Sequence, residues 1–265
     1  MEDVNGVCAR AMSRQIILCG TGPEVTVRFS PPIDCSDVPY ELAFVDLQTT
    51  NTVINVREGR NTVIYKAGEA DACAVSVPEG TYNVDGINDF LYNFLSRQFE
   101  EKFKSGEYFF DLKADTSTHR CSISTSFKIF FGEKEGETGP TLGSALGFTS
   151  NTVEPTANKN AYTPAEGTFS LLEDFNVFVT CNVIESGYVN TRVSHNIYQF
   201  HIEVQPGVIV EESAAHLVFY RVTHRCIDDI TLRLENEKGE LIALKDDTKL
   251  RVHLVLRERR YGNAC

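Results

Sequence analysis

The sequence predicts an all-β protein: a single jelly-roll β-sandwich with one inserted amphipathic helix. Three observations support this prediction. Apolar and polar residues alternate along many short segments, which is the period of a strand with one buried face. Turn-forming residues separate these segments, as in a two-sheet sandwich. One segment alone departs from the alternation and repeats at helical spacing.

The composition is that of a globular domain. The chain has 265 residues, of which 42% are hydrophobic and 23% are charged. β-Sandwiches of about 200–250 residues commonly form one domain. No Pro/Ser-rich linker divides the apolar segments into two groups. We therefore expect a single domain over residues 1–265, with a core at 15–257 and flexible arms at 1–13 and 258–265.

The clearest strands lie near the C-terminus. Apolar residues alternate along 250–256 and along 230–234, and the polar segment between them contains Gly239. This arrangement predicts a hairpin. Long alternating runs also occupy 121–131 and 175–184. Further strands, rich in β-branched and aromatic residues, are expected at 15–19, 24–30, 40–48, 52–56, 62–66, 72–77, 107–113, 198–204 and 216–223.

One helix is expected at about 86–103. Its apolar residues recur at helical spacing: Ile87, Phe90, Leu91, Phe94, Leu95, Phe99 and Phe103. Asp85 is the expected N-cap, and Ser105 with Gly106 should end the helix. We expect this helix to close one end of the sandwich. A short helical turn is expected at 141–147.

The segment 148–168 is polar, rich in turn formers and without any period. It is predicted to be a long surface loop, a kind of segment that often carries function. Because it lacks an apolar face of its own, we expect it to order against a neighbouring subunit or to stay mobile at the outer surface.

The charge balance disfavours strong binding to nucleic acid. The formal net charge is −12 and the isoelectric point is about 5.0, so the chain should repel a phosphate backbone. Two basic clusters are interpreted as solvated surface charge. One is Arg257, Arg259 and Arg260, and the other is Arg221, His224 and Arg225.

Targeting signals are not evident. No apolar run approaches the roughly 20 residues that a membrane-spanning helix needs, and the N-terminal residues do not resemble a signal peptide. The eight cysteines show no zinc-type spacing. We expect no membrane span, no secretion by a signal peptide, and reduced, mostly buried thiols in an intracellular protein.

No pattern of catalytic or metal-binding residues is present. The six histidines form no His-x-His pair and no His-Glu-x-x-His helix. Gly143–Gly147 places its glycines at the wrong spacing for a nucleophile elbow, and phosphate-binding loops are absent. The neighbouring acids Asp228 and Asp229, like Asp246 and Asp247, should diverge. We expect no catalytic, cofactor-binding or metal site and no enzymatic activity.

Six segments together resemble a known family. They are Tyr40–Val45, Thr52–Val56, Val77–Tyr82, Leu142–Phe148, Cys181–Asn190 and Leu250–Leu256. In order and spacing they resemble the single jelly-roll minor capsid or penton proteins of Polinton/Maverick elements and adintoviruses, over about 15–257. Leu18–Gly22 also looks like a site for the maturation protease of such elements.

The resemblance implies a structural role in a virion. It implies a penton-like vertex subunit that forms a homopentamer beside a double jelly-roll major capsid protein, assembled inside the host cell. Three alternatives stay open. They are a trimeric jelly-roll module that recognises a carbohydrate or receptor, a domesticated host copy of the capsid protein, and a jelly-roll enzyme. The absence of tryptophan disfavours a sugar platform, and the histidine spacing disfavours an enzyme.

Overall fold

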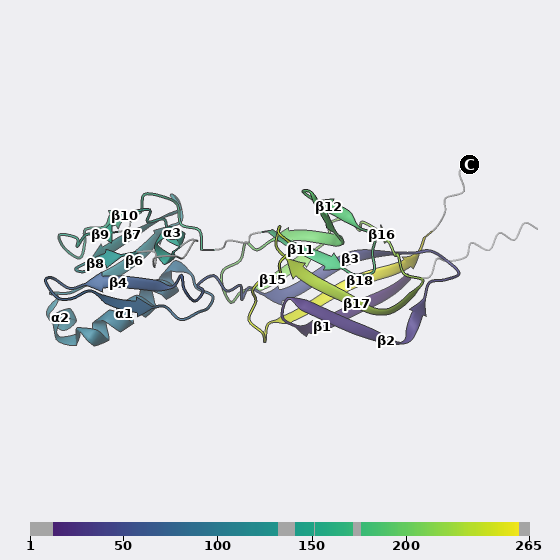
Figure 1. Cartoon of the computed structure of the whole chain (residues 1–265), viewed down its shortest axis with the longest axis horizontal. Coiled ribbons are helices and arrows are strands. Elements are labelled where there is room, and N and C mark those ends of the chain that lie inside the picture. The colour runs from purple at the N-terminus through teal and green to yellow at the C-terminus, as the bar shows by residue number, and fades with distance from the viewer. Residues whose placement is uncertain (1–12, 132–140, 151, 172–175, 260–265) are drawn as a thin grey trace, which may run out of the picture. The chain divides into compact units, whose positions relative to one another are not determined.

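The computed structural model describes residues 13–131, 141–150, 152–171 and 176–259, which form mainly antiparallel β-structure (Figure 1). The chain divides into two compact units. Unit 1 comprises 1–51 and 174–265, and unit 2 comprises 52–173. The expected single domain over 1–265 stays a prediction, and within it the contacts separate these two units. Composition does not mark this division, because unit 2 starts directly after a strand of unit 1 without a linker.

Unit 1 is a sandwich of two antiparallel sheets (Figure 1). The first sheet, which we call the β1 sheet, has the order β1-β18-β3-β15, and the second, the β2 sheet, has the order β14-β11-β17-β2. The strands of the β1 sheet are β1 (Ser13–Thr21), β18 (Lys249–Glu258), β3 (Tyr40–Thr50), β15 (Ile209–Ser213) and the short β16 (Tyr220–Arg221), which also pairs with β3. Those of the β2 sheet are β14 (Asn196–His201), β11 (Asn176–Cys181), β17 (Cys226–Glu235) and β2 (Glu24–Asp34).

This strand order is that of a jelly roll. Numbered one to eight along the chain, the strands of these two sheets other than β16 have the orders 1-8-3-6 and 5-4-7-2. Each successive connection therefore crosses between the sheets, except that from the fourth strand to the fifth, as in two Greek keys. The predicted jelly roll is confirmed. The arms expected at 1–13 and 258–265 lie outside the described residues, except for Ser13, Glu258 and Arg259.

The predicted hairpin of 230–234 with 250–256 is wrong. β17 pairs with β2 and β11, whereas β18 pairs with β1 and β3 in the other sheet. Both strands have one apolar face, and placing them in opposite sheets turns both faces into the core. The polar segment still turns, because Glu235 forms a bridge with Leu241 and Gly239 has a φ of 83°.

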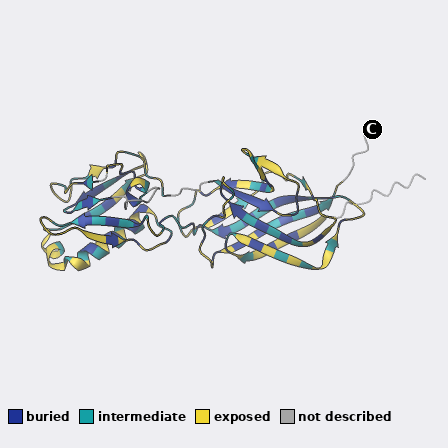
Figure 2. Ribbon diagram, in the orientation of Figure 1, coloured by how far each residue is buried: buried dark blue, intermediate teal, exposed yellow. Residues whose placement is uncertain are grey.

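Along these strands buried residues alternate with more exposed ones, and the buried, inward-facing residues form the sandwich core (Figure 2). Leu250, Val252, Leu254 and Leu256 are each at most 1% exposed, as their alternation predicts. Leu18 is also fully buried, in a strand that pairs with β18 along its whole length. The intact sandwich therefore does not present Leu18–Gly22 to a protease.

Unit 2 has two smaller antiparallel sheets with the orders β10-β7-β6 and β5-β4-β8-β9. The strands are β4 (Thr62–Lys66), β5 (Cys73–Ser76), β6 (Phe110–Asp115), β7 (Arg120–Thr125), β8 (Lys128–Phe130), β9 (Thr152–Val153) and β10 (Thr163–Pro164). The predicted strand 121–131 is split between β7 and β8, which belong to different sheets. The predicted strand 52–56 is reduced to a bridge between Val56 and Gly80 and an isolated bridge residue at Val53.

Phe127 explains the break between β7 and β8. It is fully buried, and its ring centroid lies 5.0 Å from that of Tyr108 and 5.9 Å from that of Tyr65. The Phe127 N–H donates to Oγ1 of Thr125 at 3.1 Å, so it does not continue the β7 ladder. The alternation continues through the break because Phe127 points into the core of unit 2.

The predicted helix forms in unit 2 as α1 (Val84–Gln98) and α2 (Glu100–Ser105), separated at Phe99. Ile87, Leu91 and Leu95 are buried. The helix packs against β6, and the Leu112 N–H of β6 donates a hydrogen bond to Asn88 Oδ1 of α1 at 2.8 Å. The sequence led us to expect that this helix closes one end of the sandwich, but it belongs to unit 2 and covers a sheet of that unit.

The helix ends differ partly from the sequence prediction. The N-cap is Asn83, whose Oδ1 accepts from the Gly86 N–H at 2.8 Å, and not Asp85. Gly106 ends α2 in the left-handed conformation, as predicted. The predicted turn at 141–147 forms α3 (Leu142–Ala145).

The described residues of the loop 148–168 are held by unit 2 itself. Ala165 is 1% exposed, and its N–H donates to the Cys121 carbonyl at 2.8 Å. β10 pairs with β7, and the Tyr162 hydroxyl donates to Asp111 at 2.6 Å. The expectation that this loop needs a neighbouring subunit to order is therefore wrong for these residues. Backbone pairing supplies the contacts that its apolar content does not.

Candidate assembly surface

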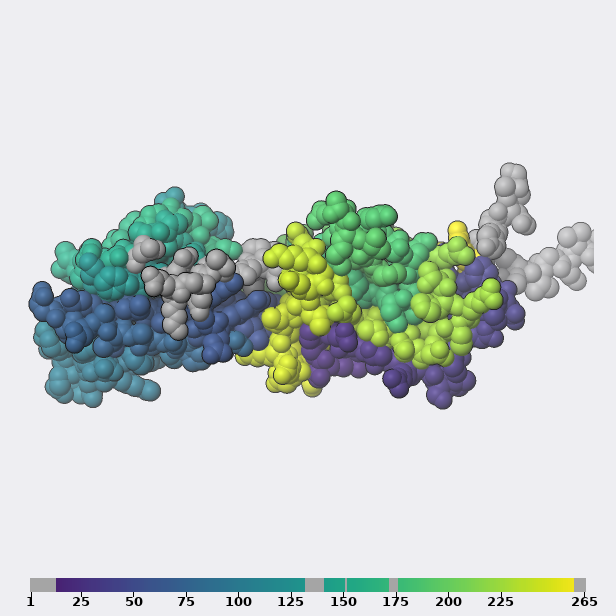
Figure 3. All heavy atoms as spheres, viewed as in Figure 1, coloured from purple at the N-terminus to yellow at the C-terminus, as the bar shows by residue number. Residues whose placement is uncertain are grey.

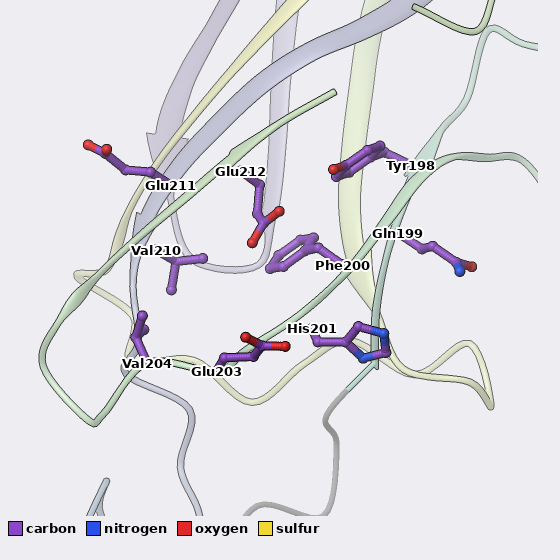
Figure 4. Close-up of a pocket in the computed structure, with 9 residues that line it drawn as sticks. All are labelled: Tyr198, Gln199, Phe200, His201, Glu203, Val204, Val210, Glu211 and Glu212. Carbon is purple, nitrogen blue, oxygen red and sulfur yellow. The ribbon is translucent and has the colours of Figure 1, made fainter. Parts of the chain in front are cut away.

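β14 and β15 form one edge of the sandwich of unit 1. In the described part of the chain, each of these strands pairs on one side only, β14 with β11 and β15 with β3. A hollow of about 390 Å³ lies between the two edges, and we call it the edge hollow (Figure 4). It is lined by Tyr198, Gln199, Phe200, His201, Glu203, Val204, Val210, Glu211 and Glu212.

Strand alternation determines which side chains enter the edge hollow. In β15, Val210 is buried, and Glu212 lies two residues later on the same face. Glu211 lies on the opposite face, where its carboxylate accepts from Gln48 Nε2 at 2.7 Å. Figure 4 agrees, since Glu212 points toward Phe200 while Glu211 points away. A glutamate therefore faces inward at the rim of the sandwich.

Two carboxylates of the edge hollow, those of Glu203 and Glu212, are not bonded to any cation of the described residues. No described residue forms a hydrogen bond or ion pair with the carboxylate of Glu203 or of Glu212. Burial raises the pKa of Glu212 above its ordinary value, and the nearby Glu203 raises it further, while His201 acts in the opposite direction. The edge hollow therefore carries negative charge that, among the described residues, only His201 opposes.

Aromatic rings form the wall next to these carboxylates. Tyr198 of β14 stacks on Phe44 of β3, with ring centroids 4.1 Å apart and an interplanar angle of 9°. Burial, and then the charge of Glu212, raises the pKa of the Tyr198 hydroxyl. A second hollow of about 480 Å³ continues past Tyr198 toward Ala214 and Tyr220. The open edge thus combines negative charge with aromatic surface.

A small hairpin near this edge carries exposed apolar side chains. It consists of β12 (Gly187–Val189) and β13 (Arg192–Ser194). Its paired residues Tyr188 and Val193 are 78% and 56% exposed. Figures 2 and 3 show the hairpin standing out from the body of unit 1. Exposed apolar groups of this kind are typical of contact surfaces.

The hairpin is firmly attached at its base. Ile184 forms an antiparallel bridge with Val222, next to β16, and its carbonyl lies 2.8 Å from Nδ1 of His195. Arg192 approaches the buried Glu235 at 3.4 Å. Tyr188 and Val193 are therefore presented on a fixed support.

The histidines do not gather into a metal site. Within the described residues, no three His, Cys, Asp or Glu side chains are placed to hold a metal ion. His253 lies instead on the outer face of the β1 sheet, where its Nδ1 is 3.1 Å from Asp46. The absence of an active site stays a prediction.

The thiols of the described cysteines are free. They are Cys19, Cys35, Cys73, Cys121, Cys181 and Cys226, whereas Cys8 and Cys265 lie outside the described residues. Burial raises the pKa of Cys121 and of Cys181 to about 12, which makes both thiols unreactive. Cys19, Cys73 and Cys226 are exposed, so the expectation of mostly buried thiols fits only half of the described cysteines.

The two basic clusters differ in their surroundings. Arg257 is not simply solvated, because it pairs with Glu41 at 2.5 Å and lies 3.3 Å above the ring of Phe219. Arg221, His224 and Arg225 are exposed, as predicted. Arg260 lies outside the described residues.

Two elements of this surface were not predicted from the sequence. Val208–Val210 is a short apolar run that indicates β15, but three residues are too few to distinguish a strand. The β12–β13 hairpin was also missed, although Asn190 at its turn, with a φ of 54°, is the residue type that such turns favour. Of the predicted strand 216–223, only the two residues of β16 form a strand. The predicted strand 198–204 corresponds to β14, which begins and ends earlier.

Both units of the chain match a solved structure of a known capsid protein. The match covers 94% of this chain and 100% of the other, with a TM-score of 0.51 and 9% sequence identity. The similar protein is the mavirus penton protein. It was solved as a selenomethionine-labelled crystal structure. At 9% identity, the similarity to the mavirus penton protein establishes a shared fold.

The other comparisons give no assignment. No protein-family model matches the sequence, and no curated protein matches it. In the ranges that the structure describes, no helix is both long enough and apolar enough to cross a membrane. The similarity to the mavirus penton protein therefore rests on the course of the chain.

Proposed function

We propose that this chain is a penton-like structural subunit of the capsid of a virus or virus-like mobile element. The observation that carries the proposal is the topology. An eight-stranded jelly roll bears a large insertion between β3 and β11, and the whole of this arrangement is similar to the mavirus penton protein. The resemblance of the six sequence segments to Polinton/Maverick and adintovirus minor capsid proteins supports the same role.

The proposed role places the function in surfaces and not in a catalytic pocket. The subunit would form a homopentamer at a capsid vertex and contact a double jelly-roll major capsid protein in the virion. Around such a ring, one face of each subunit contacts a different face of the next. The open edge and the β12–β13 hairpin supply two unlike surfaces of this kind on unit 1.

Native mass spectrometry of the full chain across a concentration range tests this proposal. We expect a species with five copies of the 29.6 kDa chain, visible as five-fold rings by negative-stain electron microscopy. A strict monomer at high micromolar concentration would overturn the penton role. A trimer would favour the receptor-recognising alternative.

A further inference from the structure

The edge hollow offers contacts that no described residue of unit 1 fills. It has two strand edges that no further described strand pairs with, an aromatic wall at Tyr198 and Phe200, and two carboxylates to which no described residue is bonded. A free strand edge accepts an extended segment through main-chain hydrogen bonds. The unneutralised carboxylates favour a segment that carries arginine or lysine. The complementary ligand is therefore a short, extended, basic and aromatic peptide.

We propose that residues 259–261 of a second copy of this chain, Arg-Arg-Tyr, dock in the edge hollow, with Arg260 against Glu203 and Glu212 and Tyr261 beside Tyr198. The proposal rests on the self-association proposed above and names its contact. In a chain with a net charge of −12, adjacent arginines beside an aromatic residue are a scarce feature. This segment also follows directly after β18 in the sequence.

The same copy cannot supply this segment. The Arg259 N–H donates to the Pro39 carbonyl at 2.7 Å, which places the start of the segment at one end of β3. Glu212 lies opposite Leu47, eight residues further along β3, or about 26 Å at strand spacing. Arg260 and Tyr261 extend at most about 7 Å beyond Arg259. The contact is therefore between copies.

The other basic cluster is a poorer candidate. Arg221, His224 and Arg225 lie on a segment held by hydrogen bonds from Glu185 N–H to the Arg221 carbonyl and from Cys35 N–H to the Arg225 carbonyl. This fixed backbone cannot enter a hollow between two strand edges. Arg221 therefore provides a matched control for charge reversal.

The direct test is peptide binding. A fluorescein-labelled peptide spanning residues 257–264 is titrated by fluorescence anisotropy into the full chain carrying Arg260→Glu, whose own segments no longer compete. We expect saturable binding that weakens with added salt. We also expect about tenfold weaker binding when the acceptor carries Glu203→Gln and Glu212→Gln. Absence of binding, or equal binding to both acceptors, would overturn the proposal.

Oligomer dissociation provides the second measurement. We expect Arg260→Glu to raise the concentration of half-dissociation about tenfold, and Glu203→Arg in the same chain to restore it. Arg221→Glu should leave it unchanged. If the unmodified chain is pentameric but the peptide does not bind, the docking proposal fails and the penton role stands. If the peptide binds and the chain forms an oligomer other than a pentamer, only the penton role fails, whereas a strict monomer would overturn both proposals.

Discussion

Tyr198 of β14 and Phe44 of β3 stack with ring centroids 4.1 Å apart, although the two strands belong to opposite sheets of the jelly roll. Phe44 is 2% exposed, whereas Tyr198 also lines both hollows of the open edge. This pair therefore links the sandwich core to the surface proposed for assembly. It holds the two sheets together at the edge where neither β14 nor β15 has a second described strand partner.

Phe44→Ala should lower the free energy of unfolding of unit 1 by about 3–5 kcal/mol, because it leaves a cavity in the core. A double-mutant cycle with Tyr198→Ala should give a coupling of about 0.5–1.5 kcal/mol for the stacked pair. Urea denaturation followed by circular dichroism measures both. Tyr188→Ala is the matched control and should change stability by less than about 0.5 kcal/mol. A coupling near zero would mean that the rings do not support each other.

The raised pKa of Glu212 predicts a pH-dependent effect of removing its charge. Because ionisation is harder in the folded state, this carboxyl destabilises the fold above its folded pKa and has no such effect below the ordinary value. Glu212→Gln should therefore raise the thermal midpoint at pH 7 and leave it unchanged near pH 3, in dilute protein that is not self-associated.

Glu211→Gln is the control for this measurement. Glu211 lies on the opposite face of β15 and is bonded to Gln48, so its replacement should not raise the midpoint at pH 7. A lower midpoint for Glu212→Gln at pH 7 would show that Glu212 has a favourable partner within the monomer.

Asn83 should contribute to the stability of unit 2 as the N-cap of α1. Asn83→Ala removes the acceptor of the Gly86 N–H and should cost about 1 kcal/mol, while Asn83→Ser retains a capping oxygen and should be nearly neutral. Asp85→Ala should cost less, because Asp85 is a first-turn acid and not the cap. Thermal denaturation compares the three variants. An equal loss for Asn83→Ala and Asn83→Ser would argue against capping.

Replacing Gly143 by alanine should change the stability of unit 2 in the direction opposite to that expected from helix propensity. Replacing a helical glycine by alanine ordinarily stabilises by about 0.5–1 kcal/mol. At Gly143, however, an added Cβ would lie 2.3 Å from Cβ of Phe131. Gly143→Ala should therefore destabilise unit 2 by about 1–3 kcal/mol.

Gly187→Ala provides the comparison, because an added Cβ there meets its nearest atom, the Ser194 carbonyl oxygen, at 4.0 Å. Denaturant midpoints of the two variants decide the question. A stabilised Gly143→Ala variant would show that Phe131 can move away at little cost.

The sequence by itself determined the local elements of this protein. The alternation of Leu250, Val252, Leu254 and Leu256 identified β18 and its buried face, and the helical period at Ile87, Leu91 and Leu95 identified α1. These predictions succeeded because burial of one face leaves a period in the sequence of a single element. The jelly-roll fold class followed from the number of such strands and from the family resemblance.

Only the tertiary structure decided which strands are neighbours. Ser13 pairs with Arg257, and 230–234 does not pair with 250–256. The alternation shows that each strand has one buried face, but that face is buried equally well whichever sheet the strand joins. The same ambiguity hid the inserted unit and the edge hollow. Glu212 has the composition of any exposed glutamate, and its position at an open edge arises from the strands that fold around it.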